Sequence, residues 1–311
     1  MYSDDLHPAN DNWSSCEDKF AVENNRHYES IFALGTGYLT VRSSIEEGFT
    51  DDDQSHEYMR MPVNVTLENL PETKNRYGTF LPVVQSRHPL LRTGLTNLPW
   101  FLGLVVTVDG EKLDMEHGAI SDYRRWLDIK AATLYRTFVW QTKSGRRINL
   151  LFTRFMNPEL RFTCVQECKI TMLEGGGGEV TVESAVDNNV RTNGLEVFTE
   201  HAVDAEENIM LSDVTTNIGR RVVTASAAHV SRTDQYRVAK EPRKISAVYS
   251  FSLPEGEEAV IQKVSAVASD MYFPADDLHD AAKTMLNNLA GKDTGALHKA
   301  HRAVWAGYWD I

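Results

Sequence analysis

Residues 134–152 read LYRTFVWQTKSGRRINLLF and carry the clearest structural signal in this sequence of 311 residues. Residues 134–140 and 148–152 are rich in aromatic and β-branched side chains, which favour extended strands. Between them lies Lys143-Ser144-Gly145, whose glycine can adopt the left-handed conformation that a short hairpin loop needs. The pattern therefore predicts a β-hairpin.

Similar patterns occur on both sides of this hairpin. An apolar stretch at 100–108 runs into the tight-turn dipeptide Asp109-Gly110, and four glycines at 175–178 separate two more expected strands. Further strands are predicted at 164–173, 180–186, 195–202, 222–230, 245–252 and 259–267. So many strands at short, regular spacing predict a mainly β fold, a large two-layer antiparallel β-sandwich. The stretch 49–97 is expected to form long loops around a few short strands.

After Pro274 the apolar residues change to helical spacing. A first helix is expected from Leu278, Ala282, Met285 and Leu289. Asp276 is the expected N-cap, and Gly291 follows the expected end. A second stripe consists of Leu297, His301, Val304, Trp305 and Tyr308. We therefore divide the chain into a sandwich domain over 1–272 and a short helical linker over 273–311.

The charge of the chain argues against nucleic acid as a partner. With 32 basic and 44 acidic side chains the net charge is −12, and residues 1–60 hold thirteen of the acidic residues and four of the basic ones. Such a surface repels phosphodiester backbones. The segment 220–244 has the opposite balance, with seven basic and two acidic residues. We interpret it as a solvated face, with an anion-binding or partner surface as the alternative.

Cysteine usage and the N-terminus bear on location. Cys164 and Cys168 lie four residues apart on an expected strand, where their Cα atoms would be roughly 13 Å apart, beyond disulfide reach. Cys16 has no nearby partner, so reduced thiols are expected. No apolar run approaches the ~20 residues of a membrane span. The acidic N-terminus lacks the layout of a signal peptide. We expect a cytoplasmic protein without a membrane partner.

No catalytic, cofactor-binding or metal-binding residue is predicted. Gly35-Thr36-Gly37 lacks the third glycine and the βαβ context of a dinucleotide loop. Glu46-Glu47 and Asp51-Asp52-Asp53 are interpreted as solvated loop carboxylates, since adjacent residues of a strand point to opposite faces. His298 and His301 could share a helix face, but no further ligand is placed nearby for a metal ion, so helix packing or solvation is expected.

Several short motifs together resemble a known family. In chain order they are Tyr28–Arg42 (YESIFALGTGYLTVR), Glu46-Glu47-Gly48, Asn97-Leu98-Pro99-Trp100, Val108-Asp109-Gly110-Glu111, Tyr123–Asp128 (YRRWLD) and Arg154-Phe155. This order resembles the N-terminal domain of glycoside hydrolase family 65, which includes maltose, trehalose, kojibiose and nigerose phosphorylases and acid trehalase relatives. The segment 301–311 is similar to the helical linker before the family's barrel. The chain departs from the family pattern at Thr36, usually Asn, and at Thr40 and Ser43, usually Gly.

The resemblance implies a galactose-mutarotase-like super-sandwich followed by a linker and then an α/α barrel that carries the catalytic acid and the phosphate-binding residues. The parent enzyme would be an inverting phosphorylase or hydrolase of α-glucosidic disaccharides, with inorganic phosphate as co-substrate of a phosphorylase and no cofactor. The matching region ends before the barrel, so we expect a non-catalytic domain that is inactive alone. Its partners would be the barrel, in cis or in trans, and a second copy in a homodimer.

Val304, Trp305, Tyr308 and Trp309 lie close together on the last expected helix, and we expect them to dock the barrel. The aromatic residues of 28–42 are expected to fill the sandwich core rather than to stack on sugar. Arg42 is expected to pair with a nearby carboxylate, such as that of Glu46 or Glu47, rather than with phosphate. Two alternatives stay open: a self-standing carbohydrate-binding or scaffold protein, and a subunit that docks a separately encoded barrel.

Overall fold

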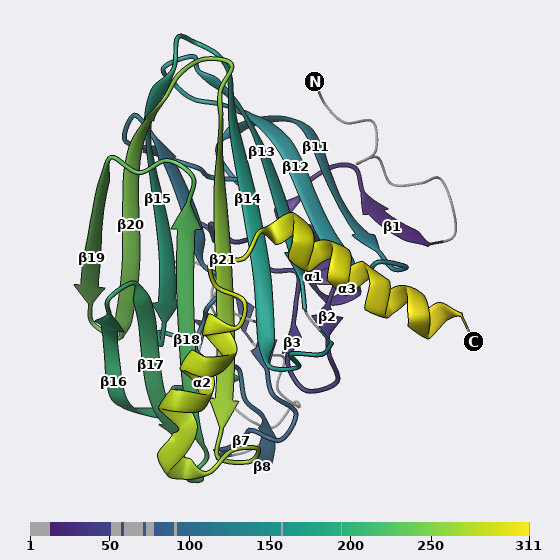
Figure 1. Cartoon of the computed structure of the whole chain (residues 1–311), viewed down its shortest axis with the longest axis vertical. Helices are drawn as coiled ribbons and strands as arrows, with labels where there is room; N and C mark the ends of the chain where they lie inside the picture. Colours follow the sequence, from purple (N-terminus) through teal and green to yellow (C-terminus); the bar gives the residue numbers. More distant parts are fainter. Residues whose placement is uncertain are drawn as a thin grey trace.

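Two antiparallel sheets face each other and form the body of the protein (Figure 1). A computed structural model describes residues 13–50, 57–58, 71–72, 78–89, 92–156, 158–193 and 195–310. The larger sheet has nine strands in the order β1-β11-β12-β13-β14-β21-β18-β17-β16, and the smaller has five in the order β10-β9-β15-β20-β19. This arrangement confirms the predicted mainly β, two-layer antiparallel sandwich.

The large sheet consists of β1 (Ser14–Glu17), β11 (Ala119–Asp128), β12 (Thr133–Gln141), β13 (Arg147–Phe155), β14 (Thr163–Glu174), β21 (Glu258–Ser269), β18 (Arg221–Val230), β17 (Ile209–Thr216) and β16 (Phe198–Glu206). The five-stranded sheet consists of β10 (Glu111–Lys112), β9 (Leu104–Val108), β15 (Gly178–Asp187), β20 (Lys244–Leu253) and β19 (Gln235–Glu241). Three small sheets accompany them: β2 (Leu34–Gly35), β3 (Thr40–Val41) and β6 (Thr79–Phe80); β4 (Glu57–Tyr58) and β5 (Pro71–Glu72); β7 (Gln85–His88) and β8 (Arg92–Leu95). The helices are α1 (Val22–Ile31), the 3-10 turn η3 (Ala275–Asp277), α2 (Leu278–Asn287) and α3 (Thr294–Trp309).

The tight turns form where the sequence predicted them. Gly145 has φ 86° in the loop between β12 and β13, and Asp109 and Gly110 have φ 48° and 82° between β9 and β10. The elements that were not predicted include β11, β17, β19 and α1. The expected N-cap of the first C-terminal helix was wrong by one residue, because Asp277 precedes Leu278 and Asp276 lies inside η3.

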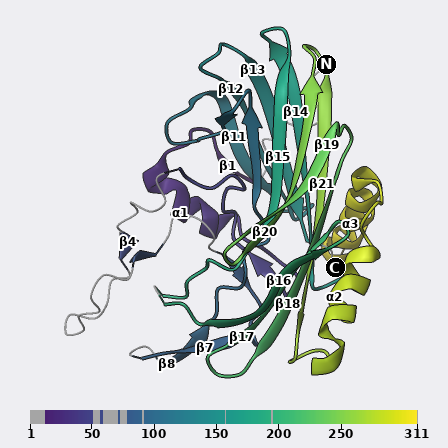
Figure 2. The same ribbon diagram turned by 90° about the vertical axis from the view of Figure 1, so that its left-hand side faces the viewer.

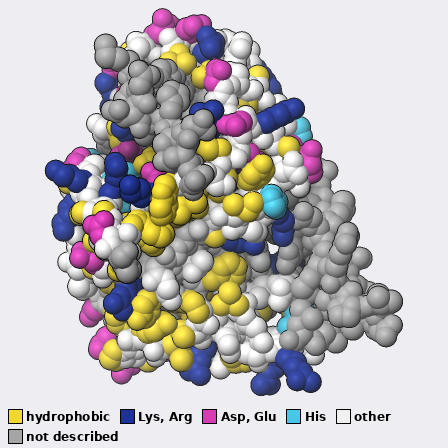
Figure 3. All heavy atoms as spheres, turned by 90° about the vertical axis from the view of Figure 1, so that its right-hand side faces the viewer, with side chains coloured by type: hydrophobic (Ala, Val, Ile, Leu, Met, Phe, Trp, Pro, Cys, Tyr) yellow, Lys and Arg dark blue, Asp and Glu magenta, His cyan; other side chains and the backbone are white. Residues whose placement is uncertain are grey.

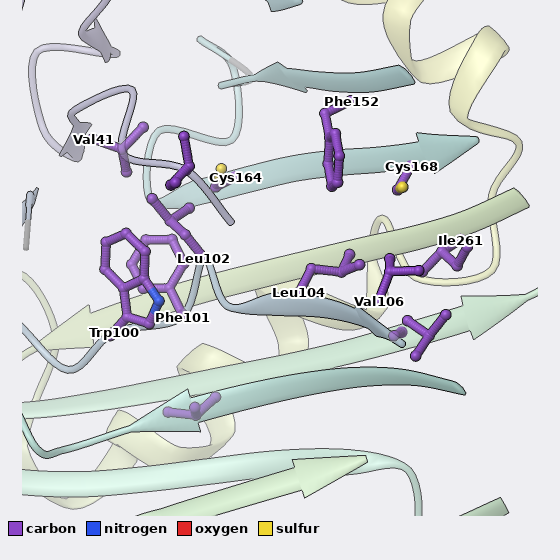
Figure 4. Close-up of a cluster of buried hydrophobic side chains, with 14 of the residues drawn as sticks. Val41, Trp100, Phe101, Leu102, Leu104, Val106, Phe152, Cys164, Cys168 and Ile261 are labelled. Carbon is purple, nitrogen blue, oxygen red and sulfur yellow. The ribbon is translucent and has the colours of Figure 1, made fainter. Parts of the chain in front are cut away.

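One hydrophobic core fills the space between the two sheets. Figure 4 shows side chains from β9 and the segment before it opposite side chains of the large sheet. Those labelled include Trp100, Phe101, Leu102, Leu104, Val106, Phe152, Cys164 and Cys168. Both β14 cysteines are buried free thiols in this core, while Cys16 is an exposed free thiol.

A second, smaller core lies on the outer face of the large sheet. There Leu278, Ala282 and Leu286 of α2 pack on apolar residues of β18 and β21. Figure 2 shows α2 and α3 on the side of the large sheet opposite to α1. The last strand ends at Ser269, and a domain boundary after residue 272 stays a prediction. Within the described residues, no helix is long and apolar enough to cross a membrane.

Candidate docking site

Helix α3 is held on the large sheet by its N-terminal half. The carboxylate of Asp293 caps the helix by accepting a hydrogen bond of 2.8 Å from the Ala296 backbone N–H. One turn further on, His298 and His301 face the sheet rather than solvent. His298 Nε2 lies 3.0 Å from Thr133 Oγ1, and His301 Nε2 lies 2.7 Å from the Ala131 carbonyl oxygen.

The two imidazoles therefore serve to pack the helix, as the sequence analysis expected. Both rings also contact Phe155, with centroid distances of 5.1 and 4.8 Å. Burial, together with the neighbouring His301 and Arg302, lowers the pKa of His298 to about 4. Among the described residues, no three His, Cys, Asp or Glu side chains gather as metal ligands.

The structure brings the four predicted docking residues together at the C-terminal half of α3. Val304 and Trp305 are half-buried, while Tyr308 is 53% and Trp309 41% exposed. The Trp305 ring lies 5.6 Å from that of Tyr308 and 6.3 Å from that of Trp309, centroid to centroid. The Nε1 of Trp305 is buried and has no hydrogen-bond partner in the described part of the chain.

Two residues that the sequence analysis missed extend this patch. Trp13 contacts Trp309 edge-on at 4.8 Å between centroids, and its carbonyl accepts a hydrogen bond from the Ile129 backbone N–H. Trp309 in turn donates from Nε1 to the Lys130 carbonyl oxygen at 3.0 Å. Trp13 and Ile129 are 37% and 36% exposed. We call Trp13, Ile129, Val304, Trp305, Tyr308 and Trp309 the α3 patch.

No local sequence signal could have added Trp13 and Ile129 to the patch, since they lie far from α3 in the chain.

Figure 3 shows the right-hand face of Figure 1, the side on which α3 ends. Several groups of exposed hydrophobic side chains lie on this face.

Glu46 and Glu47 do not lie in solvent, so the interpretation as solvated loop carboxylates was wrong. They are 6% and 3% exposed and sit in a turn against the large sheet. Arg136 of β12 donates to both oxygens of Glu47 at 2.5 Å and to Glu46 Oε2 at 2.7 Å. Arg154 of β13 donates to Glu46 Oε1 and to the Ser44 carbonyl. Burial alone would raise the pKa of Glu46, but the two guanidiniums hold it below its usual range.

Arg42 pairs with a nearby carboxylate as expected, but with that of Glu29 rather than with Glu46 or Glu47. Its Nη2 donates to the Arg26 carbonyl at 2.9 Å and to Ser30 Oγ at 2.6 Å, and its Nε lies 3.8 Å from Glu29. Arg42 thus contacts α1 rather than Glu46 or Glu47. Phe32 is fully buried in the core as expected.

A second buried ion pair ties β1 to α1. Arg125 of β11 lies 2.7 Å from Glu17 and donates to Asn25 Oδ1 at 3.2 Å. The hydroxyl of Tyr123 donates to the same Glu17 at 2.8 Å. Together with the pairs around Arg136 and Arg154, these contacts form what we call the N-terminal ion network.

The N-terminal ion network has a structural role. Its carboxylates are engaged by guanidiniums, whereas glycoside cleavage needs an acid facing a sugar across a cleft. The cavity beside Arg125, Arg136 and Arg154 is about 10 Å³, which is room for a single water molecule. A second cavity, lined by Ser86 and His88, is about 20 Å³. Neither could hold a disaccharide. Asp51-Asp52-Asp53 lie outside the described residues.

The fold defines the class of this protein: an antiparallel β-sandwich domain with a C-terminal helical extension. The sequence model described as "Glycosyl hydrolase family 65, N-terminal domain" matches residues 15–308. The chain therefore belongs to glycosyl hydrolase family 65, in its N-terminal domain, as the motifs of the sequence indicated.

Individual relatives agree with this family. The kojibiose phosphorylase of Halothermothrix orenii is 23% identical over 318 residues, which cover 96% of this chain and 37% of the relative. The maltose phosphorylase of Bacillus subtilis is 23% identical over 307 residues, covering 96% and 39%. A solved structure assigned as a kojibiose phosphorylase, from the human microbiome, superimposes with a TM-score of 0.75 at 16% identity, over 94% of this chain and 37% of that one. The chain thus spans less than two fifths of the length of these proteins.

Proposed function

We propose that this chain is the non-catalytic N-terminal domain of a family 65 glycoside phosphorylase or hydrolase that acts on α-glucosidic disaccharides. Its role is to support an α/α barrel, which docks on the α3 patch. The observation that carries this proposal is the patch itself, in which the aromatic rings of Tyr308 and Trp309 are exposed. An exposed aromatic patch of this kind marks an interaction site.

The substrate class of the proposal comes from the relatives. Their names state phosphorolysis of kojibiose and maltose, so an α-glucosidic disaccharide with inorganic phosphate as co-substrate is the proposed chemistry of the whole enzyme. The proposal includes a homodimer face on the sandwich. It also includes a cytoplasmic location, where free thiols such as those of Cys164 and Cys168 stay reduced.

Activity of the chain alone tests the non-catalytic role. The purified chain is incubated with maltose, trehalose, kojibiose and nigerose, with and without phosphate, and free glucose and glucose 1-phosphate are measured. No turnover is expected, because cleavage needs a positioned acid and a held nucleophile in a closed cleft. Turnover that disappears when one carboxylate of this chain is mutated would refute the proposal. Tight binding of a disaccharide would favour the self-standing carbohydrate-binding alternative instead.

Docking is tested with a family 65 barrel encoded in the same genome. The barrel is co-expressed with the chain and with the variant Tyr308→Ser, which removes the most exposed aromatic ring of the α3 patch. Co-purification with the original chain and a clear loss with the variant are expected. The matched control is Leu95→Ser, which removes an exposed apolar side chain from β8, outside the patch. Equal recovery of the barrel with all three chains would contradict docking at the α3 patch.

A further inference from the structure

A small cavity lies beside the hairpin of β7 and β8, at the lower end of the sandwich (Figure 2). Its volume is about 20 Å³, which is room for about one or two oxygen-sized atoms. The lining is mostly polar, and none of the lining residues is acidic. It includes Ser86, His88, Arg92, Gly94, Thr192 and Asn193. We call this cavity the hairpin cavity.

The pairing of β7 with β8 places polar side chains on one face of the hairpin. Ser86 and His88 alternate with exposed residues along β7, and they are 3% and 6% exposed. In the register of the hairpin, His88 lies opposite Arg92. Ser86 lies opposite Gly94, and opposite residues of an antiparallel pair share a face of the sheet. The cavity therefore receives a hydroxyl, an imidazole and a guanidinium group from one hairpin.

The turn that follows Thr192 supplies a second wall. Thr192 and Leu195 exchange both backbone hydrogen bonds, at 2.9 and 3.0 Å, which holds this turn closed. The Thr192 hydroxyl accepts a hydrogen bond of 3.1 Å from the Asn97 backbone N–H, so its own proton is left to donate. Within the described residues no acceptor takes this proton, and the side chains of Ser86 and Asn193 form no hydrogen bond. Uncharged donors thus remain free at the cavity.

Arg92 adds a positive charge that no carboxylate neutralises. The chain has 44 acidic and 32 basic side chains, yet in the described part of the chain the exposed guanidinium of Arg92 forms no ion pair or hydrogen bond. The backbone of Arg92 has φ 64°, a left-handed conformation that is unfavourable for a long side chain and is found most often at functional sites. A free cation beside unpaired donors is the composition of an anion site.

Asn217 fixes the hairpin against the large sheet. This residue directly follows β17. Its Oδ1 accepts a hydrogen bond of 2.8 Å from the Arg87 backbone N–H, and its Nδ2 donates to the Arg87 carbonyl oxygen at 2.8 Å. The two bonds restrain β7 in the way that a paired strand would. The donors of β7 are therefore held in place before a ligand binds, which lowers the entropic cost of binding.

We propose that the hairpin cavity binds the phosphoryl group of a small anion, either inorganic phosphate or a phosphate monoester. One or two oxygen atoms enter the cavity and accept hydrogen bonds from the hydroxyls of Ser86 and Thr192. Arg92 pairs with an oxygen atom that stays at the mouth of the cavity. A carboxylate has only two oxygen atoms, fewer than the groups of donors gathered here, whereas a phosphoryl group presents three.

This inference goes beyond the proposed function and does not depend on it, because every residue of the site belongs to the sandwich. Two variants test it. Gly94→Val fills the cavity without strain, since a Cβ at this position meets no atom within 4 Å and valine suits a strand. Arg92→Gln removes the charge. The matched control, Arg237→Gln, removes the same charge from the exposed strand β19, outside the site. Thermal unfolding without ligand checks that each variant is folded.

Isothermal titration calorimetry at constant ionic strength measures the binding of inorganic phosphate and of glucose 1-phosphate to the full chain, with acetate as the carboxylate control. Saturable binding at one site is expected for the original chain and for Arg237→Gln. The dissociation constant should rise at least tenfold in Arg92→Gln and in Gly94→Val, since each variant removes or blocks hydrogen bonds to a charged ligand. Equal binding of both ligands would show that the phosphoryl group alone is recognised, and tighter binding of the ester would add a contact to its sugar.

Three results would overturn the inference. The first is the absence of saturable binding of either phosphate. The second is binding that survives in Gly94→Val or in Arg92→Gln, because this would place the anion elsewhere on the chain. The third is acetate that binds as tightly as phosphate, since the cavity would then recognise a negative charge and not a phosphoryl group.

Discussion

Arg136 and Glu47 form a two-pronged ion pair in which both N···O distances are 2.5 Å, and the two side chains are 3% and 0% exposed. The pair joins β12 to the turn at 46–47, which is otherwise far away in the chain. Glu46 shares the same guanidinium and adds Arg154. The N-terminal segment is thus fixed to the large sheet by buried charge as well as by apolar packing.

Removing the Arg136 guanidinium should lower the free energy of unfolding substantially. Arg136→Met leaves Glu47 buried without its cation, and breaking a buried pair in this way costs about 3–5 kcal/mol. Urea unfolding, followed by circular dichroism, should show this loss in the free energy of unfolding. The matched control is Arg147→Met on β13, whose pair with Glu174 is exposed and should be worth less than about 1 kcal/mol. Equal losses in both variants would show that the buried network adds no special stability.

The sequence could not reveal this network, because each partner lies about 90 residues from the other. The pattern rule that sends adjacent carboxylates to opposite faces applies to strands. Glu46 and Glu47 instead lie in a turn, from which both can reach one guanidinium. Only the folded structure brings Arg136 close to these two carboxylates.

The same reasoning explains which elements were predictable. The hairpin around Gly145 and the turn at Asp109-Gly110 are local, so residue types within a few positions determine them. Helix α1 reads VENNRHYESI and lacks an apolar stripe; its buried face holds the polar Asn25 and Glu29, which hydrophobic periodicity cannot detect. Strand β19 was missed because it is an exposed edge with mixed side chains.

Lys263 should make stability depend on pH in the alkaline range. It is fully buried, and its Nζ donates to the carbonyls of Gly103 and Ala185 at 2.7 and 2.9 Å. Burial lowers its pKa to about 7, from 10.5 in the unfolded chain. Between these values the unfolded state binds the extra proton, so stability rises as pH increases from 7 toward 10.

Urea unfolding at pH 7, 8 and 9 checks this. The free energy of unfolding should rise by about 1 kcal/mol per pH unit relative to Lys263→Met, which has no proton to lose. The nearby Cys164, whose pKa burial raises from 9.0 to about 12, lowers stability as pH rises toward 9, but it is present in both proteins and so largely cancels in the comparison. If the free energy of unfolding changes with pH in the same way for both proteins, Lys263 stays charged in the folded state.

The α3 patch should cause the chain to associate at high concentration, since it exposes aromatic rings. Trp305→Ser combined with Trp309→Ser should lower the light scattering of concentrated solutions. Because Trp309 also bonds to Lys130 and contacts Trp13, this variant should release the end of α3 as well. Tyr308→Ser separates the two effects: it should lower association without changing thermal unfolding. Equal light scattering from the original chain, the double variant and Tyr308→Ser would contradict association through the α3 patch.

The packing of α3 against the large sheet should weaken in acid. His298 has a folded-state pKa of about 4, because its ring is largely buried against Thr133 and Phe155. The unfolded value is near 6.5, so a detached helix binds the proton more readily throughout the range between 6.5 and 4. The packing contribution of His298 is therefore complete above pH 6.5 and is lost as pH falls toward 4.

Hydrogen exchange of peptides covering α3 measures this loss. After correction for intrinsic rates, exchange at pH 4.5 should be roughly tenfold faster than at pH 7, a factor reduced from the full shift because the ring is not completely buried. His298→Gln keeps a polar contact for Thr133 but does not titrate, so the acid-induced rise in exchange of its α3 should be clearly smaller. The rise that remains belongs to His301, whose pKa burial also lowers. Peptides from α2, which packs through Leu278, Ala282 and Leu286, serve as the internal control. If α2 loosens together with α3, acid acts on the whole outer core, and His298 is not the titrating group that releases the helix.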